Sequence, residues 1–181
     1  MPVLETERLL LCKLTPNDVE FIFELLNTPA WLKFIGDRGV KNLDNARDYI
    51  ITGPMFSYNK NGFGLWLTKL KDSNTPLGLC GLIKRDALED VDIGFAFLPE
   101  YTGKGYALEA AKATMEYAKT ELGLKRIVAI TTQDNEHSIA LLKKIGFHYE
   151  KLIKLPAEDE ELMLFASKTL EPVKPVVHVS N

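Results

Sequence analysis

The chain has 181 residues, of which 46% are hydrophobic and 26% charged, with a formal net charge of −3 and a sequence isoelectric point near 5.7. This acidic balance argues against a protein whose main ligand is the phosphate backbone of a nucleic acid. No apolar run approaches the roughly 18 residues of a membrane span, and the N-terminal segment MPVLETERLLL is acidic where an export signal is basic. We therefore expect a cytoplasmic protein that binds neither nucleic acid nor membrane.

The sulfur and imidazole side chains do not indicate a metal site. Cys12 and Cys80 each lie in a strand-like apolar stretch, which favours buried free thiols over a disulfide or a nucleophile. His137, His148 and His178 show no ligand spacing with cysteines or carboxylates. We expect no metal.

The first part of the chain is predicted to form one strand and one helix. The strand covers residues 5–14, and the segment TPND that follows it starts the helix. Thr15 is the expected N-cap and Pro16 occupies the first helical position. Pro29 is expected to end this helix.

A second helix and three strands follow. The helix covers LDNARDYI, residues 43–50, and is expected to stop at Gly53 and Pro54. The strands come from GFGLWLTKLK, LGLCGLI and VDIGFAFL, with turns at DSNTP and at the acidic segment KRDALED.

The last third of the chain alternates between helix and strand. A long helix is predicted from about Tyr106 to Leu122, a strand over 126–131, and a short helix over 138–144 closed by Gly146. FHYEKLIKL and EELMLFAS are the last two strands. This order predicts an α+β protein, a mixed sheet with helices on its faces.

Gly103 and Gly105 stand between an apolar strand and the long helix. Such a helix start binds anions, because its N–H groups are unpaired and the helix dipole adds about half a positive charge. The loop is not a Walker motif, since its lysine lies between the glycines. It is not a dinucleotide loop either, because Leu108 replaces the third glycine. Taken alone, the two glycines are explained equally well by a tight turn.

A longer pattern surrounds the two glycines. The segment EYTGKG follows the scheme Gln/Arg-x-x-Gly-x-Gly/Ala from its first glycine onward, and NEHSIALLKKIGF comes about thirty residues later. The two segments resemble the coenzyme A-binding motifs of the GNAT superfamily of N-acetyltransferases. TERLLL, followed by a helix starting at TPND, resembles the branch of the ribosomal-protein alanine acetyltransferases RimJ and RimL. The resemblance covers residues from about 5 to 167.

The resemblance implies the acyl-CoA N-acyltransferase fold, with a mixed, mostly antiparallel central sheet flanked by helices. Residues 1–168 would form a single N-acetyltransferase domain, and residues 169–181 a C-terminal tail. Acetyl-coenzyme A would be the cosubstrate, and an amine, either a small molecule or a protein N-terminus, the acceptor.

The resemblance also implies a set of cofactor-binding residues. Backbone amides of one loop would bind the pyrophosphate of coenzyme A, with its two glycines giving clearance. The loop residues are Thr102, Gly103, Lys104, Gly105, Tyr106 and Ala107. The side chain of Lys104 either adds positive charge to this site or is simply solvated.

Two further segments would hold the pantetheine arm. The strand end formed by Ala96, Phe97 and Leu98 would pair with the pantetheine amides, as an added strand pairs with a sheet edge. Asn135 matches an asparagine that contacts this arm. It also stands where a helix N-cap is expected, and the two roles are compatible.

Direct attack of an amine on a thioester needs a base, an oxyanion stabiliser and an acid for the departing thiolate. Asp92 aligns with the carboxylate that serves as base in relatives, directly or through water. An ordinary aspartate, with a pKa of about 3.9, is too weak unless burial raises its pKa or water relays the proton. The alternative for Asp92 is a substrate-orienting charge. The oxyanion stabiliser would be a backbone N–H near Phe97 or Leu98.

The chain departs from the common family pattern at two positions. Many members carry a tyrosine where this chain has Leu142, and the RimL-like branch suggests Ser138 as the replacement that protonates the thiolate. A small residue that keeps the cofactor channel open is the alternative role of Ser138. The second departure is Glu100, where the pattern has Gln or Arg. We expect Glu100 to point away from the pyrophosphate, which a carboxylate would repel.

The acceptor side is less defined. Trp31 and Phe34 could line a substrate wall or simply pack a helix pair onto the sheet. Arg38 is a candidate for binding a carboxylate of a peptide substrate. The turn RDALEDVD either draws a cationic amine towards the cleft or is a solvated hairpin turn.

The leading interpretation is an N-acetyltransferase that moves acetyl from acetyl-coenzyme A to a primary amine, a peptide N-terminus or a small amine, by direct attack in a ternary complex. The alternative is a non-catalytic acyl-CoA-binding sensor or regulatory module. The sequence leaves open the acceptor and the choice between a monomer and a homodimer.

Overall fold

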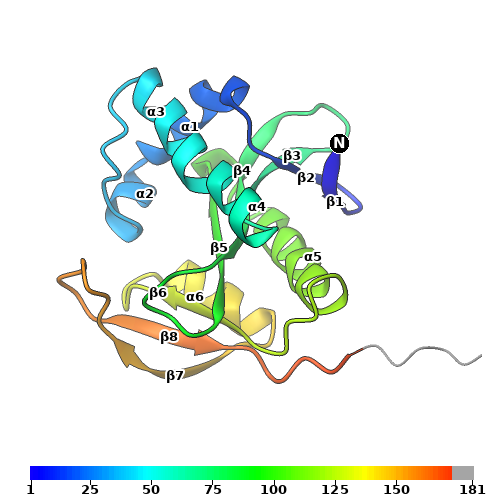
Figure 1. Ribbon diagram of the computed structural model, residues 1–181, viewed down its shortest axis with the longest axis vertical. Coiled ribbons are helices and arrows are strands. Elements are labelled where there is room, and N and C mark those ends of the chain that lie inside the picture. The colour runs from blue at the N-terminus through cyan, green and yellow to red at the C-terminus, as the bar shows by residue number, and fades with distance from the viewer. Residues whose placement is uncertain (173–181) are drawn as a thin grey trace, which may run out of the picture.

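The computed structural model describes residues 1–172, and Figure 1 shows them as a twisted sheet with helices on both faces. The sheet has eight strands in the order β1-β2-β3-β4-β5-β6-β8-β7. They are β1 (Pro2–Glu5), β2 (Leu9–Lys13), β3 (Leu65–Leu70), β4 (Pro76–Ile83), β5 (Val91–Phe97), β6 (Ile127–Thr131), β7 (His148–Ile153) and β8 (Leu162–Ala166). Every neighbouring pair is antiparallel except β5 and β6. The predicted fold class, mixed and mostly antiparallel, is confirmed.

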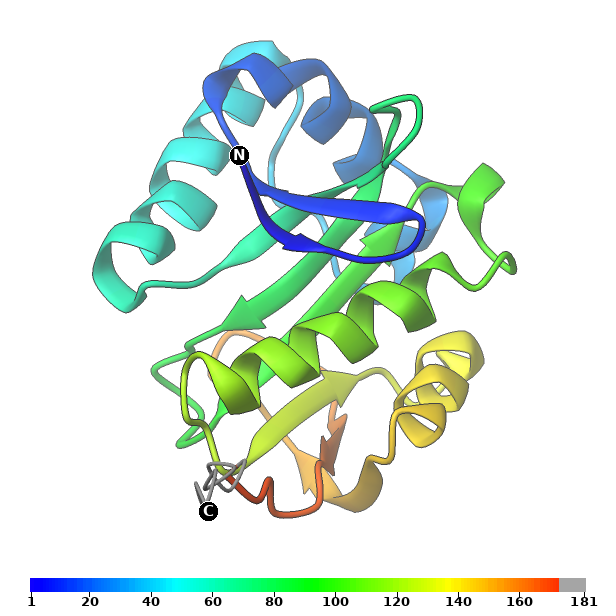
Figure 2. The same ribbon diagram turned by 90° about the vertical axis from the view of Figure 1, so that its right-hand side faces the viewer.

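The helices divide between the two faces of the sheet. They are α1 (Val19–Leu26), α2 (Pro29–Phe34), α3 (Leu43–Ile50), α4 (Phe56–Asn61), α5 (Tyr106–Thr120) and α6 (Glu136–Lys144). Figure 2 shows α5 lying across the strands on one face. One apolar cluster joins α5 to this face through Ala110, Ala111 and Trp66, and a second joins α1–α3 to the other through Ile22, Ala46 and Leu79. A core on each side therefore fixes the sheet between two helical layers.

The predicted first strand is in fact a hairpin of two strands. β1 and β2 pair antiparallel, with Leu4 opposite Leu11, around a turn at residues 6–8. Thr6 closes this turn, because its N–H donates to the Leu9 carbonyl at 2.9 Å and its hydroxyl accepts from the Leu9 N–H at 3.0 Å. The sequence hides the turn, since it has no glycine, proline or asparagine.

The helix start at Thr15 and the end of this helix before Pro29 are confirmed, but a further helix that was not predicted begins at Pro29. Thr15 caps a short 3₁₀ turn that leads into α1, and its side chain accepts from the Asn17 N–H at 3.3 Å. Pro29 does not merely end α1; it begins α2, with Thr28 as the N-cap. Proline suits a first helical position because its missing N–H would be unpaired there anyway.

Gly53 and Pro54 do not stop the second predicted helix. They lie in a π-helical segment, Ile51–Met55, that leads from α3 directly into α4. A wider π turn leaves some backbone groups without their usual α-helical partners, so it accommodates a residue without an N–H. The helix ends at Gly62, which has a left-handed φ of +80°.

β5 and β6 separate soon after they meet. Their pairing consists of Val91 with Ile127 and Asp92 with Val128, whereas β5 continues to Phe97 and β6 to Thr131. Beyond Asp92, the facing edges of the two strands are no longer bonded to each other. This divergence opens the middle of the sheet.

The remaining elements follow the prediction closely. The long helix, the strand before α6, and Gly146 after α6 with a φ of +91° all lie where expected. Cys12 and Cys80 are free thiols, half-buried and buried. No helix among residues 1–172 has the length and apolarity of a membrane span. Most of the predicted tail, residues 173–181, lies outside the described residues.

Candidate functional site

A large cavity lies where β5 and β6 separate. It is a cleft of about 1170 Å³ whose lining residues come from both helical layers and from the open part of the sheet. On one side are the loop after β5 and the first turns of α5 and α6, and on the other side are α2, α3, α4 and the turn between β4 and β5. We call these the cofactor half and the acceptor half of the cleft.

The glycine loop forms one end of the cofactor half. Gly103 and Gly105 have φ angles of +73° and +81°, left-handed values that favour glycine. Gly105 is the N-cap of α5 and supplies no capping side chain, so the first N–H groups of the helix have no side-chain partner at the cap. An open helix start beside a roomy cleft fits the pyrophosphate of coenzyme A, which these N–H groups would hold.

Arg8 fixes this loop from the β1–β2 turn. Its Nη1 donates to the Lys104 carbonyl at 3.1 Å, its Nε donates to Glu109 Oε2 at 2.7 Å, and its guanidinium lies 4.5 Å from the centre of the Tyr106 ring. A Cβ on Gly105 would lie 3.3 Å from Arg8 Nη2. The N-terminal hairpin therefore contacts both the glycine loop and the first turn of α5 through Arg8.

The same carboxylate ties the hairpin turn together. Glu109 Oε1 accepts from the Arg8 N–H at 2.9 Å and from the Thr6 hydroxyl at 2.6 Å. The hydrogen bonds, led by the Thr6 hydroxyl, and the Arg8 charge lower the pKa of Glu109 despite its partial burial. TERLLL is thus linked by side-chain contacts to a loop about a hundred residues later.

The backbone of β5 distinguishes the candidate residues at its end. Leu98 donates its N–H to the Leu77 carbonyl at 2.9 Å, so it belongs to the β4–β5 ladder. Neighbouring residues of a strand direct their backbone groups to opposite sides, so Phe95 and Phe97 direct theirs away from β4, towards the opening. Of the two predicted oxyanion donors, only Phe97 has its N–H on the cleft side.

Asp92 lies at the point where β5 and β6 part. The residue is 1% exposed, and Arg85 Nε donates to its two carboxylate oxygens at 3.2 and 3.3 Å. Burial raises the pKa of the Asp92 carboxyl to about 6, although the Arg85 charge and hydrogen bond act in the opposite direction. The carboxyl can therefore exchange a proton near neutral pH.

Asn135 and Ser138 line the cleft at the start of α6. Asn135 caps the helix, because its Oδ1 accepts the Ser138 N–H at 3.2 Å. Capping occupies the oxygen of the side-chain amide and leaves its two N–H donors. The predicted N-cap is confirmed, and it holds Ser138 in the first turn of a helix that faces the cavity.

The aromatic and basic residues of the acceptor half come from several elements. Trp31 and Phe34 of α2 and Tyr49 of α3 line the cleft together with Arg38 from the loop after α2. Trp31 is 5% exposed and also packs in the second apolar cluster, so its wall and packing roles are compatible.

Nearly all of the predicted site residues line this one cleft. The exceptions are Lys104, whose Nζ lies 5.7 Å from the centre of the Tyr101 ring, and Leu98, which is 4% exposed and packed in the second apolar cluster. Glu100 is exposed and does not line the cleft, in agreement with the expectation that it points away.

Sequence reasoning missed Arg8, Arg85, Tyr49 and the backbone of Phe95. Arg8 stands inside the quoted segment TERLLL, so its position was visible but its contact with the glycine loop was not. Arg85 precedes Asp92 by seven residues across a turn, a spacing that carries no signal of its own. Their proximity to the site follows from tertiary structure.

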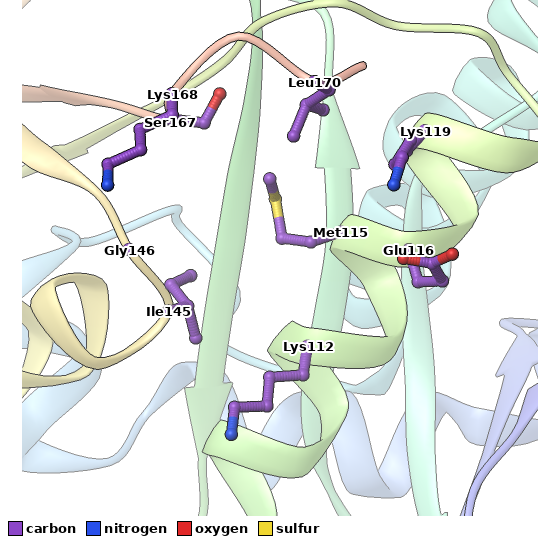
Figure 3. A pocket seen from close by; sticks show the side chains of 9 residues that line it. All are labelled: Lys112, Met115, Glu116, Lys119, Ile145, Gly146, Ser167, Lys168 and Leu170. Atoms are coloured by element: carbon purple, nitrogen blue, oxygen red, sulfur yellow. The ribbon is translucent and has the colours of Figure 1, made fainter. Parts of the chain in front are cut away.

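A second hollow lies between the middle and last turns of α5, the end of α6 and the residues that follow β8. Figure 3 shows its lining: lysines 112, 119 and 168 around the apolar side chains of Met115, Ile145 and Leu170. Its volume is about 280 Å³, and its one carboxylate is Glu116. Among residues 1–172, no group of three or more histidine, cysteine or acidic side chains is arranged to hold a metal ion.

Comparisons with known proteins agree on one family. The acetyltransferase (GNAT) domain family matches residues 8–148. An N-acetyltransferase of Bacillus subtilis named YoaA, itself uncharacterized, is 30% identical over 154 residues, which is 84% of this chain and 86% of that protein.

Solved structures share the fold. An acetyltransferase of the GNAT family from Bacillus anthracis is 28% identical and has a TM-score of 0.75. The match covers 90% of this chain and 95% of that chain. RimL, a ribosomal L7/L12 acetyltransferase solved with coenzyme A, has a TM-score of 0.79 at 16% identity, with 93% of this chain and 98% of that chain covered.

Proposed function

The chain belongs to the GNAT acetyltransferase family and is an acetyl-coenzyme A-dependent N-acetyltransferase, and we propose that it acetylates a primary amine by direct attack in a ternary complex. The acceptor would be a peptide N-terminus or a small amine. The transferase domain would comprise residues 1–168, and the protein would act in the cytoplasm.

One observation carries this proposal. A buried carboxyl, Asp92, with a pKa raised to about 6, lies in the same cleft as the open start of α5 and at the point where two strands part. The cofactor half offers backbone donors for a pyrophosphate and a strand edge for an amide-bearing arm. The base would then stand at the inner end of that arm.

When bound, acetyl-coenzyme A supplies the acetyl thioester whose carbonyl carbon the amine nitrogen attacks. Asp92, ionised above its pKa, would take the proton that the amine loses as the new C–N bond forms. Arg85, bonded through Nε to both Asp92 oxygens, would hold the carboxylate in one orientation. In this arrangement the proton would pass from the amine nitrogen to Asp92 without an intervening water molecule.

The other two roles would fall to Phe97 and Ser138. The Phe97 N–H would bind the carbonyl oxygen as it gains negative charge, since the Leu98 N–H is already bonded to Leu77. The Ser138 hydroxyl would hydrogen-bond the departing sulfur as the C–S bond breaks and pass it a proton from water. Asn135 would orient Ser138 and offer its amide N–H groups to the pantetheine arm.

Neither cysteine suits an acyl-enzyme route. Cys80 is fully buried, burial raises its pKa to about 12, and neither Cys12 nor Cys80 lines the cleft. A protonated, inaccessible thiol cannot act as a nucleophile. This supports direct transfer between the two bound substrates.

A thiol-release assay tests the proposal. The purified protein is mixed with acetyl-coenzyme A and a panel of amines that includes amino acids, peptides with varied N-termini and polyamines. We expect one amine class to release free coenzyme A well above the rate of uncatalysed hydrolysis, with the acetylated amine detected by mass spectrometry.

Binding of coenzyme A is measured on the same samples by calorimetry. Tight cofactor binding without turnover of any amine would contradict the proposal and support the alternative of a non-catalytic acyl-CoA-binding module. A burst of acetylated protein without amine would contradict direct transfer instead.

A further inference from the structure

The charges of the acceptor half bear on which amine it accepts. The turn between β4 and β5 carries three acidic residues, Asp86, Glu89 and Asp90, and Asp92 follows at the start of β5. A cationic amine would be drawn to these four carboxylates if they faced the cleft. Only Asp86 and Asp92 line the cleft. Asp90 instead accepts from Arg126 Nε at 3.0 Å, outside the cleft.

One of the two cleft-lining carboxylates is paired with an arginine from the same turn. Arg85 binds Asp92 at 3.2 Å, and Lys84 Nζ donates to the carbonyls of Leu88 and Glu89 at 2.7 and 2.8 Å. Asp86 is the one carboxylate of the acceptor half that forms no ion pair within residues 1–172. The turn therefore does not offer a polyamine a row of free carboxylates.

Positive charge, in contrast, is left over. Arg38 lines the cleft and forms no ion pair with any carboxylate of the described chain. Arg85 uses only its Nε towards Asp92, and its two Nη groups have no hydrogen-bond partner within residues 1–172. A guanidinium with unused donors is suited to bind a carboxylate at two points.

The two arginines act on the same part of the cleft. Arg38, Arg85 and Tyr49 all line the acceptor half. Burial raises the pKa of the Tyr49 phenol, and the charges of Arg38 and Arg85 act in the opposite direction. The indole N–H of Trp31, in the wall of the same half, is buried without an acceptor in the described chain. This region is thus rich in donors and poor in acceptors.

We propose that the acceptor amine carries a carboxylate within a few bonds of its nitrogen, and that Arg38 and the free Nη groups of Arg85 bind this carboxylate. The proposal rests on the proposed transferase function. Because Arg85 contacts Asp92, a carboxylate held by Arg85 places an amine a few bonds away beside the base. A free amino acid and a peptide with an acidic first residue both present this chemistry.

The test compares amines that differ only in the carboxylate. The pairs are L-alanine with L-alaninamide, and the C-terminally amidated peptides Glu-Ala-Ala and Gln-Ala-Ala, with spermidine as a polyamine. The amine of alaninamide is the weaker base and is more deprotonated at a given pH, so chemistry alone favours the amide. A preference for alanine therefore reports binding of its carboxylate, and the peptide pair reports the second source.

Arg38→Gln is the test variant, and Arg47→Gln, an exposed arginine of α3 outside the cleft, is the matched control. We expect Arg38→Gln to lower kcat/KM for the preferred carboxylate-bearing amine by about tenfold to a hundredfold, the range of a charge-assisted hydrogen bond. The paired amide, the KM for acetyl-coenzyme A and the Arg47→Gln variant should change less than about twofold. Calorimetry with coenzyme A present should give the same loss of affinity for the acid.

The outcomes separate this proposal from the transferase function. Equal turnover of acids and amides, a preference for spermidine, or an equal loss with every amine in Arg38→Gln would overturn the carboxylate site and leave the transferase standing. Binding of coenzyme A without turnover of any amine would contradict both the carboxylate site and the proposed transferase function.

Discussion

The two halves of the cleft are built in different ways. The cofactor half consists of short continuous segments: the end of β5, the loop at 102–105 and the starts of α5 and α6. At the start of α5 no side chain within residues 1–172 caps the backbone N–H groups. The acceptor half collects single side chains from α2, α3, α4 and a turn. Backbone geometry depends on local sequence, whereas a set of side chains from distant segments depends on the whole fold. Changes in one half should therefore leave the other half intact.

Replacing the base should have the largest effect. Asp92→Asn keeps the shape of the side chain but cannot accept a proton, so we expect kcat/KM for the amine to fall by about 10²- to 10⁴-fold. The dissociation constant for coenzyme A, measured by calorimetry, should stay within about twofold of the wild type. Loss of both amine turnover and coenzyme A binding would mean that the two halves are not separable.

Asp92→Asn, which should lower activity, should not lower stability above pH 6. Because burial raises the folded-state pKa of Asp92 to about 6, the carboxyl stabilises the fold when protonated, and this contribution is lost as pH rises through 6. A neutral asparagine avoids burying the charge. At pH 8 we expect the Tm of Asp92→Asn to equal or exceed that of the wild type, whereas a lower Tm would indicate that the ion pair with Arg85 dominates.

The pH profile of the wild type sharpens the assignment within the acceptor half. We expect the carboxylate form to act as the base. The kcat/KM for the amine, divided by the fraction of amine that is unprotonated, should therefore rise with pH, level off above about 6, and fall about tenfold per unit below it. Coenzyme A affinity, measured over the same range, should not follow this titration. An Asp92→Asn profile that retains the same inflection would assign it to another group.

Removing the contacts of Arg8 with the glycine loop and α5 should affect only the cofactor half. Arg8→Gln removes the donor to the Lys104 carbonyl and the contact with the Tyr106 ring, so the glycine loop loses its support from the hairpin. We expect the KM for acetyl-coenzyme A to rise by about tenfold, with kcat and the KM for the amine nearly unchanged.

Arg126→Gln is the matched control for this change. Arg126 also binds a glutamate, Glu150, at 2.7 and 2.8 Å, but it does not line the cleft. An equal rise in the KM for acetyl-coenzyme A in both variants would indicate general destabilisation and contradict a positioning role for Arg8.

The smallest expected effect is at the boundary between the halves. Ser138→Ala removes one neutral hydrogen bond to the sulfur, so kcat should fall by about threefold, with little change in affinity for either substrate. Ser138→Cys, which keeps a small polar group, serves as the control. An unchanged kcat in Ser138→Ala would leave this residue the role of keeping the channel open.

The sequence predicts the cofactor half well because its signals are local. Glycines at 103 and 105, the N-cap at Asn135 and the strand before them can each be identified from neighbouring residues. The same local reasoning fails where two rules compete. The first helix ends before Pro29 as predicted, but Thr28 and Pro29 also begin α2, which was not predicted. Pro54 does not stop the second predicted helix, because a π turn accommodates it.

The acceptor half could not be predicted to the same depth. Arg85 and Asp92 meet because β4 and β5 pair with Ile83 opposite Asp92, and Arg38, from the loop after α2, lines the same cleft. The sequence suggests that the acidic turn attracts a cationic amine. Whether it does depends on which carboxylates are already paired with arginines, and the sequence does not show this. Cytoplasmic location and a possible homodimer stay predictions.

The gap between β5 and β6 leaves room for a bound ligand to act as part of the sheet. Beyond Asp92, strands β1–β5 and strands β6–β8 are not bonded to each other at this edge, so a ligand that pairs with Phe95 and Phe97 acts as a missing strand. In hydrogen exchange, the amides of these two residues should be poorly protected in the free protein and slow markedly once coenzyme A is added. The free edge of β5 beyond Asp92 would then form its hydrogen bonds only when coenzyme A is bound.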